Sequence, residues 1–400
     1  MNLFRQWLPA LAGMVCLGLG AGLLSIYSFF VDDLSREFDT GLAVINAGPI
    51  ALLLVPGVIG PLVGRLVDRL PVRRLMLSGA TLAMVALMLA SQAPVLWLAG
   101  LAFLCFALGV SLYGPVVVNA MLVRRYPHLE ARALAIAAMG ISFASMALPP
   151  LVGVLLSVMD WRSALFSLSL VLLLLLWVVI VLGIEAGDGA VAESRQDSAD
   201  KGVYRYTPFW LIGLGLALAF NVTIVLSICY VPFFLDEGFT VTQAGWFVAL
   251  AGVGGFCGKL LIAWLADAFK AYAKWVAVSL LLVQGAGLLL LLGSESYAAV
   301  SFALMLLGFG GGGMIPIHPY LNSRYFDSAI IGRVNGAQMP LFLPFGLIGA
   351  PLAGFAYDQL GNYLLVLQVL IAVLLLAALL ISALPGSASA IFESPESVSG

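Results

Sequence analysis

Apolar stretches of about 20 residues, the length that a helix needs to cross a bilayer, follow one another through most of the chain. Short charged or Pro/Gly-containing segments separate them. This pattern predicts an all-α membrane protein with twelve transmembrane helices. We expect the helices at residues 8–31, 41–64, 74–92, 95–122, 131–156, 163–184, 208–235, 241–266, 273–293, 297–322, 331–356 and 362–384.

The composition supports a membrane protein and excludes several other classes. Hydrophobic residues make up 62% of the chain and charged residues 10%, whereas a soluble domain carries about 25% charged residues. The four cysteines lie inside apolar runs and are typical of core residues rather than disulfides or metal ligands. We see no nucleic-acid-binding pattern, phosphate-binding loop, metal cluster or nucleophile–base pair, so we expect neither an enzyme nor a cofactor.

The first apolar run is long enough to be a retained span. Arg5 could belong to a signal peptide, but the run from Leu8 to Val31 is too long for one. The charges of the loops then predict the orientation. Fifteen of the 18 Lys and Arg residues fall in alternate loops, and only Arg36 and Arg162 lie in the opposite ones. The positive-inside rule places both termini and the central loop in the cytoplasm. We expect the protein in the cell (inner) membrane.

The two halves of the chain repeat weakly. Gly64-Arg-Leu-Val-Asp68 corresponds to Ala263-Trp-Leu-Ala-Asp267 at an offset of 199 residues. We therefore expect two pseudo-symmetric six-helix bundles, with a binding site at the midplane where they meet. The predicted division is an N-terminal bundle at 1–184, a cytoplasmic linker at 185–207, a C-terminal bundle at 208–384 and a disordered tail at 385–400.

Lys259 is the residue of the four charged types that falls deep within a predicted span. It lies eight positions before Asp267, or about 12 Å along a helix. With Asp267 at the membrane surface, Lys259 lies near the midplane, since half of the hydrocarbon thickness is about 15 Å. A cation at that depth is a hypothesis of function. The alternatives are a lysine that snorkels to the surface or a neutral buried amine.

The first basic hairpin has the sequence Gly64-Arg-Leu-Val-Asp68-Arg69-Leu-Pro71-Val-Arg73-Arg74. It resembles the signature loop between helices 2 and 3 of the major facilitator superfamily, although Pro71 stands where glycine is usual. The resemblance implies the major facilitator fold. We expect Asp68, Arg69, Arg73, Arg74 and the corresponding Asp267 to form gating contacts between helix ends. The alternative is positive charge that only sets topology.

Other segments resemble the monocarboxylate-porter-like branch and the neighbouring oxalate/formate exchangers. They include Arg124-Arg125-Tyr126, Asp160-Trp161-Arg162 and Thr207-Pro208-Phe209-Trp210. In that branch, helix 8 carries an arginine that is taken to bind the substrate carboxylate, and Lys259 stands at its position. An acidic residue four places earlier is replaced by Gly255, which argues against proton coupling by that route.

Polar residues in the other cavity-lining helices are further candidates for substrate binding. His318, in a Gly- and Pro-rich stretch that predicts a breakable helix, lies about 9 Å inside the membrane and could carry a proton. The alternative is a structural histidine. The resemblance implies that helices 1, 4, 7 and 10 line the cavity. It therefore favours the following residues, each of which could instead only bond neighbouring helices: Tyr27, Tyr113, Asn119, Asn221 and Tyr230.

These observations predict a secondary active transporter that moves a small organic anion, such as a monocarboxylate, by alternating access. It would work as a proton symporter or an anion exchanger. The expected partners are the small-molecule substrate, the lipid bilayer and protons, and we expect a monomer. The alternative is an exporter of drugs or neutral metabolites with the same fold. A non-transporting membrane sensor would need a signalling domain, which the loop and tail do not offer.

Overall fold

The computed structural model describes residues 3–45, 48–185, 202–265, 270–294 and 296–386. Regular structure in these residues is helical, and twelve segments are long and apolar enough to cross a membrane. The predicted class, an all-α protein with twelve spans, is confirmed. Most of the predicted linker (185–207) lies outside the described residues. The same holds for almost all of the predicted tail (385–400).

The described residues form two compact units. The first draws on Met1–Leu129, Ala133–Asp197 and Ile331–Leu343, and the second on Glu130–Arg132, Ser198–Ile330 and Pro344–Gly400. Two long helices, α8 (Glu130–Val158) and α15 (Ile331–Leu360), therefore contribute residues to both units. The division into two six-helix bundles, separated by a linker at 185–207, stays a prediction.

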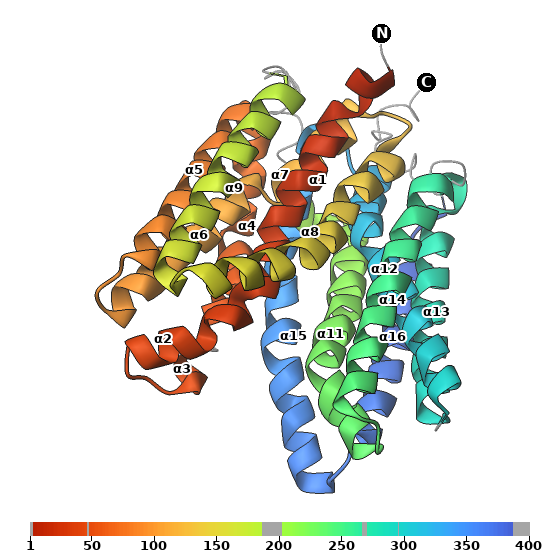
Figure 1. The fold of residues 1–400 in the computed structure, drawn as a ribbon. Coiled ribbons are helices and arrows are strands. Elements are labelled where there is room, and N and C mark those ends of the chain that lie inside the picture. Colours follow the sequence, from red (N-terminus) through yellow and green to blue (C-terminus); the bar gives the residue numbers. More distant parts are fainter. Residues whose placement is uncertain (1–2, 46–47, 186–201, 266–269, 295, 387–400) are drawn as a thin grey trace, which may run out of the picture. The chain divides into compact units, whose positions relative to one another are not determined.

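In the first unit the chain forms α1 to α9 (Figure 1). Helices α5 and α6 lie side by side, and α9 packs on α5. The bounds of the elements are α1 (Leu3–Ile26), η1 (Tyr27–Phe30), α2 (Val31–Glu37), α3 (Leu42–Ile45), η2 (Gly48–Ile50), α4 (Ala51–Arg69), α5 (Val72–Ser91), α6 (Leu96–Tyr113), α7 (Pro115–Arg125), α8 and α9 (Trp161–Gly183).

In the second unit, α12 packs closely against α14, and α13 packs against α14 and α16 (Figure 1). The elements are η3 (Val203–Arg205), α11 (Thr207–Asp236), α12 (Val241–Leu265), η4 (Lys270–Tyr272), α13 (Ala273–Leu292), α14 (Tyr297–Tyr325), η5 (Ser328–Ile330), the later part of α15 and α16 (Leu364–Ser382).

Three of the predicted helices differ in the structure. The span predicted at 41–64 is not a single helix: α3 ends at Ile45, and α4 begins at Ala51 after the 3-10 turn η2 and ends at Arg69. The span predicted at 95–122 breaks at Gly114, which is extended at ψ −153°, and Pro115 begins α7. The break follows from the steric effect of proline on the residue before it. The first span ends at Ile26 and continues as a 3-10 turn. Just before that turn, the Ser25 hydroxyl donates to the Gly22 carbonyl at 2.5 Å, a local bond that is frequent where helices bend.

The helix expected to be breakable is continuous. Helix α14 runs unbroken from Tyr297 to Tyr325 although it contains Pro316 and Pro319. Prolines are tolerated in transmembrane helices because neighbouring groups satisfy the backbone atoms that they free.

Asp160 fixes the start of α9. Its carboxylate accepts hydrogen bonds from the backbone N–H groups of Arg162 and Ser163, both at 3.1 Å. This is an N-cap, which satisfies amides that the helix itself cannot pair. Hydrogen bonds from the side chain and backbone of Ser163 lower the pKa of this carboxyl.

Glycines let α12 and α14 approach each other closely. A Cβ atom at Gly254 would meet the carbonyl oxygen of Met305, and one at Gly258 would meet that of Phe309. On α14, a Cβ at Gly312 would meet the backbone of Gly255. Small residues at such spacings allow backbones to touch and raise van der Waals contact between membrane helices.

We expect a single methyl group on this interface to destabilise the protein. Gly254→Ala places its Cβ against backbone, and such overpacking costs about 1–3 kcal/mol. Gly252→Ala, on the same helix, meets no atom within 4 Å and should leave stability unchanged or slightly raised. Thermal unfolding of both variants in detergent measures the difference. Equal melting temperatures would contradict the close contact.

Candidate functional site

Lys259 is buried within the second unit. Its relative exposure is 4%, and it directly follows Gly258, one of the glycines of the α12–α14 contact. The side chain therefore does not snorkel out to solvent. An ionisable group inside an apolar span is costly unless other groups or a ligand compensate its charge.

His318 lies on α14 and is 6% exposed. Its Nε2 atom lies 3.4 Å from Nδ2 of Asn322, one turn further along the same helix, and Asn322 is itself fully buried. An amide N–H directed at Nε2 favours the tautomer with its proton on Nδ1. Asn322 is thus a polar neighbour of the candidate histidine that the sequence did not single out.

The two candidates on α11 have different surroundings. Asn221 is half-buried, its Oδ1 atom accepts no hydrogen bond from the described residues, and a Cβ at Gly349 of α15 would meet that oxygen. Tyr230 is 9% exposed and stacks on Phe234 with ring centroids 5.9 Å apart. The amide oxygen of Asn221 thus has capacity for a further donor, whereas Tyr230 belongs to an aromatic cluster.

The candidates of the first unit lie in three different settings. Tyr27 is half-buried and donates a 2.6 Å hydrogen bond to the Ile45 carbonyl. Tyr113, the last residue of α6, is fully buried, and its hydroxyl has no partner among the described residues. Asn119 is half-buried on α7. The Gly114 break separates Tyr113 from Asn119, so the two do not share a helix.

Within the units, the seven proposed substrate residues fall into two sets. Tyr27, Tyr113 and Asn119 belong to the first unit, and Lys259, His318, Asn221 and Tyr230 belong to the second. Neither unit by itself contains the whole predicted site. The substrate-binding role of these residues stays a prediction.

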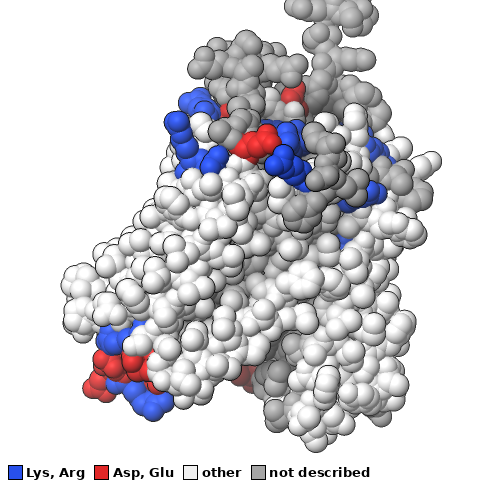
Figure 2. All heavy atoms as spheres, turned by 45° about the horizontal axis from the view of Figure 1, so that its top comes forward, with Lys and Arg blue, Asp and Glu red and all other residues white. Residues whose placement is uncertain are grey.

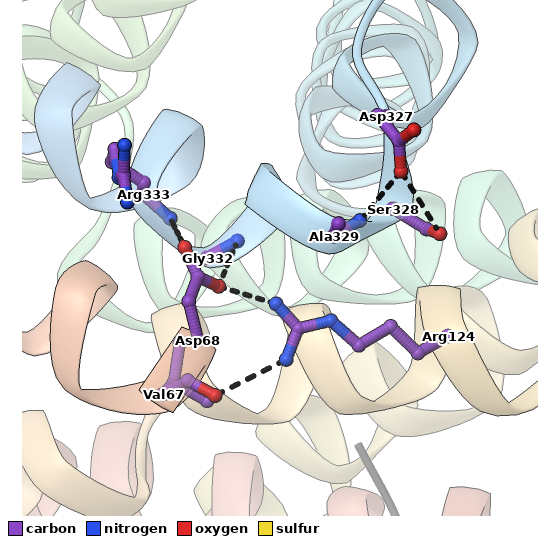
Figure 3. A network of polar contacts seen from close by, with 8 residues as sticks. All are labelled: Val67, Asp68, Arg124, Asp327, Ser328, Ala329, Gly332 and Arg333. Atoms are coloured by element: carbon purple, nitrogen blue, oxygen red, sulfur yellow. Dashed lines mark hydrogen bonds and ion pairs between the residues drawn. The ribbon is translucent and has the colours of Figure 1, made fainter. Parts of the chain in front are cut away.

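Asp68 forms a polar network at the end of α4 (Figure 3). Its carboxylate accepts hydrogen bonds from the backbone N–H groups of Gly332, at 3.1 Å, and Arg333, at 2.9 Å. It also forms an ion pair with the guanidinium of Arg124, which in turn donates to the Val67 carbonyl at 3.1 Å. The side chains of Asp68 and Arg124 are 2% and 7% exposed.

Asp68 belongs to α4, but its carboxylate caps the N-terminus of a different helix, α15. Gly332 and Arg333 lie in the first turn of α15, where backbone N–H groups have no partner within the helix. The positive end of the helix dipole favours a carboxylate there. Arg124 supplies the compensating charge that a buried carboxylate needs. One ion thus joins the ends of α4, α7 and α15 in the first unit.

The predicted partners of Asp68 are not the ones that the structure shows. Arg69 and Arg74 are exposed and Arg73 is half-buried, while the pairing guanidinium is that of Arg124. The sequence contained a signal for Arg124, because it stands with Arg125 in the last turn of a helix that ends on the same side as α4. Asp267 lies outside the described residues, and its gating role stays a prediction.

A second polar contact at a helix end lies in the second unit. The Nε atom of Arg132, in the first turn of α8, donates a 3.1 Å hydrogen bond to the carbonyl of Ala263, in the last turn of the described α12. A cation at the C-terminus of a helix interacts favourably with the helix dipole. From the sequence, we assigned Arg132 only to the loop charges that set the orientation in the membrane.

The twelve apolar spans of the described residues define a polytopic membrane protein, and several of its ionisable side chains are buried. Residues 10–346 match the family model described as Major Facilitator Superfamily. The chain belongs to the major facilitator superfamily. The homologues in this class are transporters and not enzymes.

The relatives support the predicted branch. The chain is 27% identical over 374 residues to "Monocarboxylate transporter 11" of Mus musculus, covering 89% of this chain and 82% of the relative. It is 23% identical over 399 residues to "Monocarboxylate transporter 13" of Rattus norvegicus, covering 96% and 90%. The resemblance to the monocarboxylate-porter-like branch is confirmed.

The fold is also similar to solved transporter structures. The crystal structure of the Major Facilitator Superfamily transporter FucP in the outward conformation superposes with a TM-score of 0.74. The match covers 96% of this chain and 99% of that one at 15% identity. At this identity the likeness establishes the fold alone.

We expect Asp68 and Arg124 to stabilise the protein as a coupled pair. Asp68→Asn or Arg124→Gln each leaves a buried charge without its partner, which costs about 3–5 kcal/mol. The double variant should lose less than the sum of the two, because it leaves no lone charge. Thermal or denaturant unfolding in detergent measures the cycle.

Arg74→Gln is the matched control, because this exposed arginine should change stability by less than about 0.5 kcal/mol. Strictly additive losses for Asp68→Asn and Arg124→Gln would show that the two side chains do not act together.

Proposed function

We propose that the protein is a secondary active transporter that moves a small organic anion, such as a monocarboxylate, by alternating access. Transport would be coupled to protons or to exchange with a second anion. The observation that carries the proposal is the burial of Lys259, at 4% exposure, within the membrane-spanning helix α12 (Val241–Leu265).

The position of Lys259 is informative because inserting a charged lysine into a membrane helix costs free energy. A lysine at the centre of a membrane helix costs about 2.5–3.5 kcal/mol for insertion on translocon-based scales. A carboxylate that binds beside the ammonium group would offset that cost by a charge-assisted hydrogen bond. Lysine presents a point charge rather than the planar fork of arginine, so it suits small carboxylates without demanding bidentate geometry.

The names of two relatives support the same substrate class. The mouse and rat proteins are called monocarboxylate transporters and align over most of both chains. This supports a carboxylate as the substrate class and leaves the particular acid open.

His318 is the candidate for proton coupling. A histidine changes its charge near neutral pH, and Asn322 is positioned to hold its ring in one orientation. In this proposal the two six-helix bundles, residues 1–184 and 208–384, rock about the substrate. The hydrogen bonds of Asp68 with the first amides of α15 would break and re-form in that cycle. Both termini would lie in the cytoplasm.

Uptake assays test the role of Lys259 directly. In proteoliposomes, Lys259→Ala should reduce kcat/KM for a transported carboxylate by at least about tenfold, since a hydrogen bond to a charged group contributes about 1.5–3 kcal/mol. Lys259→Arg keeps the charge and should keep part of the activity. Cys257→Ala, an exposed position two residues earlier on the same helix, is the matched control and should transport normally.

A panel of labelled carboxylates with and without an imposed pH gradient provides the complementary measurement. Stimulation by the gradient that is lost in His318→Gln supports symport, and stimulation by an anion inside the vesicle supports exchange. Full transport by the Lys259→Ala variant rules out the anion site. Protection of cells from diverse hydrophobic toxicants, without saturable carboxylate flux, would instead favour the exporter.

A further inference from the structure

The first unit encloses a cavity of about 400 Å³. Its walls come from the end of α1 with η1 and α2, from α3, η2 and the start of α4, and from the ends of α5, α6 and α9 that lie nearest to them (Figure 1). None of the residues proposed for substrate binding in the second unit takes part in it. A cavity of this size falls within the range of about 300–1,000 Å³ that is typical of ligand sites.

The lining is almost entirely hydrocarbon. Alanine, valine, leucine, isoleucine, phenylalanine, tryptophan and glycine make up the described wall apart from Tyr27. The Tyr27 hydroxyl donates to the Ile45 carbonyl at 2.6 Å, so it already satisfies a backbone group. Cavities with such walls exclude water and accept apolar ligands.

The cavity opens through side chains that are exposed on the surface of the first unit. Val44, Trp97 and Leu104 line it, and they are 55%, 67% and 48% exposed. Apolar side chains on the surface of a membrane helix face lipid tails. A ligand could therefore enter from the hydrocarbon side without passing through water.

Charged groups border the same cavity. The guanidinium of Arg162 lies 4.6 Å from the ring centroid of Trp161, a lining residue. Arg162 also donates to the carbonyls of Ser91 at 2.7 Å and Ala93 at 3.0 Å, and to Glu37 at 2.9 Å.

A second ion pair lies beside this border. Asp33 and Arg36, on α2, pair at 3.6 Å and flank the lining residue Leu34. In Figure 2 the charged side chains gather over α2, at the lower left and apart from the charges at the upper end. An apolar chamber bordered by charges of both signs is complementary to a molecule with a hydrocarbon tail and a zwitterionic head.

We propose that this cavity binds one acyl chain of a membrane phospholipid, with the head group at the border formed by Arg36, Glu37 and Arg162. The chain would fill space that the side chains leave open between α3 and α6. Tyr27, one of the residues expected to bind substrate, lines this cavity, whereas Lys259 belongs to the other unit.

Gly100 provides a way to fill the cavity without disturbing the fold. It lines the chamber, and a Cβ atom there would meet no atom within 4 Å. Leucine is also a better helix former than glycine. Gly100→Leu should therefore occupy part of the chamber while the protein remains folded. Gly252→Leu is the matched control, since Gly252 of α12 has equally open surroundings.

The experiment uses phosphatidylethanolamine with a photoreactive diazirine in its acyl chain, added to the full-length protein in detergent–lipid micelles. After irradiation, peptide mass spectrometry locates the adducts. We expect adducts on the inner lining residues Phe103, Phe106 and Trp161, and their loss in Gly100→Leu but not in Gly252→Leu. Melting curves confirm that both variants are folded.

Labelling confined to exposed Trp97 and Leu104, or unchanged inner labelling in Gly100→Leu, would overturn the proposal. A diazirine fatty acid without a head group distinguishes the source of the chain. Equal labelling of the inner residues by the fatty acid, at the same membrane concentration, would refute the phospholipid assignment. Weaker labelling by the fatty acid supports it.

Discussion

A backbone amide inside a bilayer must find its hydrogen-bond partner within the protein, because no water is available there to replace one. Helices meet this demand along their length and fail to meet it at their ends. The arrangement of this chain follows from both facts. Apart from the break at Gly114, its spans are helical in the described residues. The polar side chains of Asp68, Arg124 and Arg132 make their contacts at helix ends.

The same constraint explains how the helices associate. Apolar side chains gain little by leaving lipid for another helix, so close backbone contact and polar bonds must provide the stabilisation. Glycines on α12 and α14 provide contact in the second unit. In the first unit, Gly60 and Gly64 of α4 lie against Gly336 and Gly332 of α15. Beyond that contact, Asp68 lies in the last turn of α4, and its carboxylate accepts hydrogen bonds from the first amides of α15. Close packing and capping therefore reinforce each other on one pair of helices.

The helical pattern could be predicted from the sequence because apolar length and loop charge are local properties. The Gly114-Pro115 pair is also a local signal for a break, but it lies within one long apolar run that we predicted as a single helix. The partner of Asp68 could not be predicted in this way. Arg124 lies 56 residues away and the capped amides more than 260 residues away, so the pairing depends on how three helices pack. Lys259 was found because its charge is out of place in the pattern itself. Asn322 beside His318 was overlooked because an amide near a helix end is unremarkable in sequence.

The two contacts at helix ends obey one electrostatic rule with opposite signs. An anion, Asp68, meets the N-terminus of α15, and a cation, Arg132, meets the C-terminus of α12. Exchanging the charges would place each ion against the like end of a dipole and would also remove the hydrogen bonds, since a carboxylate cannot donate to a carbonyl and a guanidinium cannot accept from an amide. The sign of the charge at each position is therefore set by the direction in which the contacted helix runs. Arg69 and Arg74 of the basic hairpin are under no such requirement, because their exposed side chains can be solvated in any orientation.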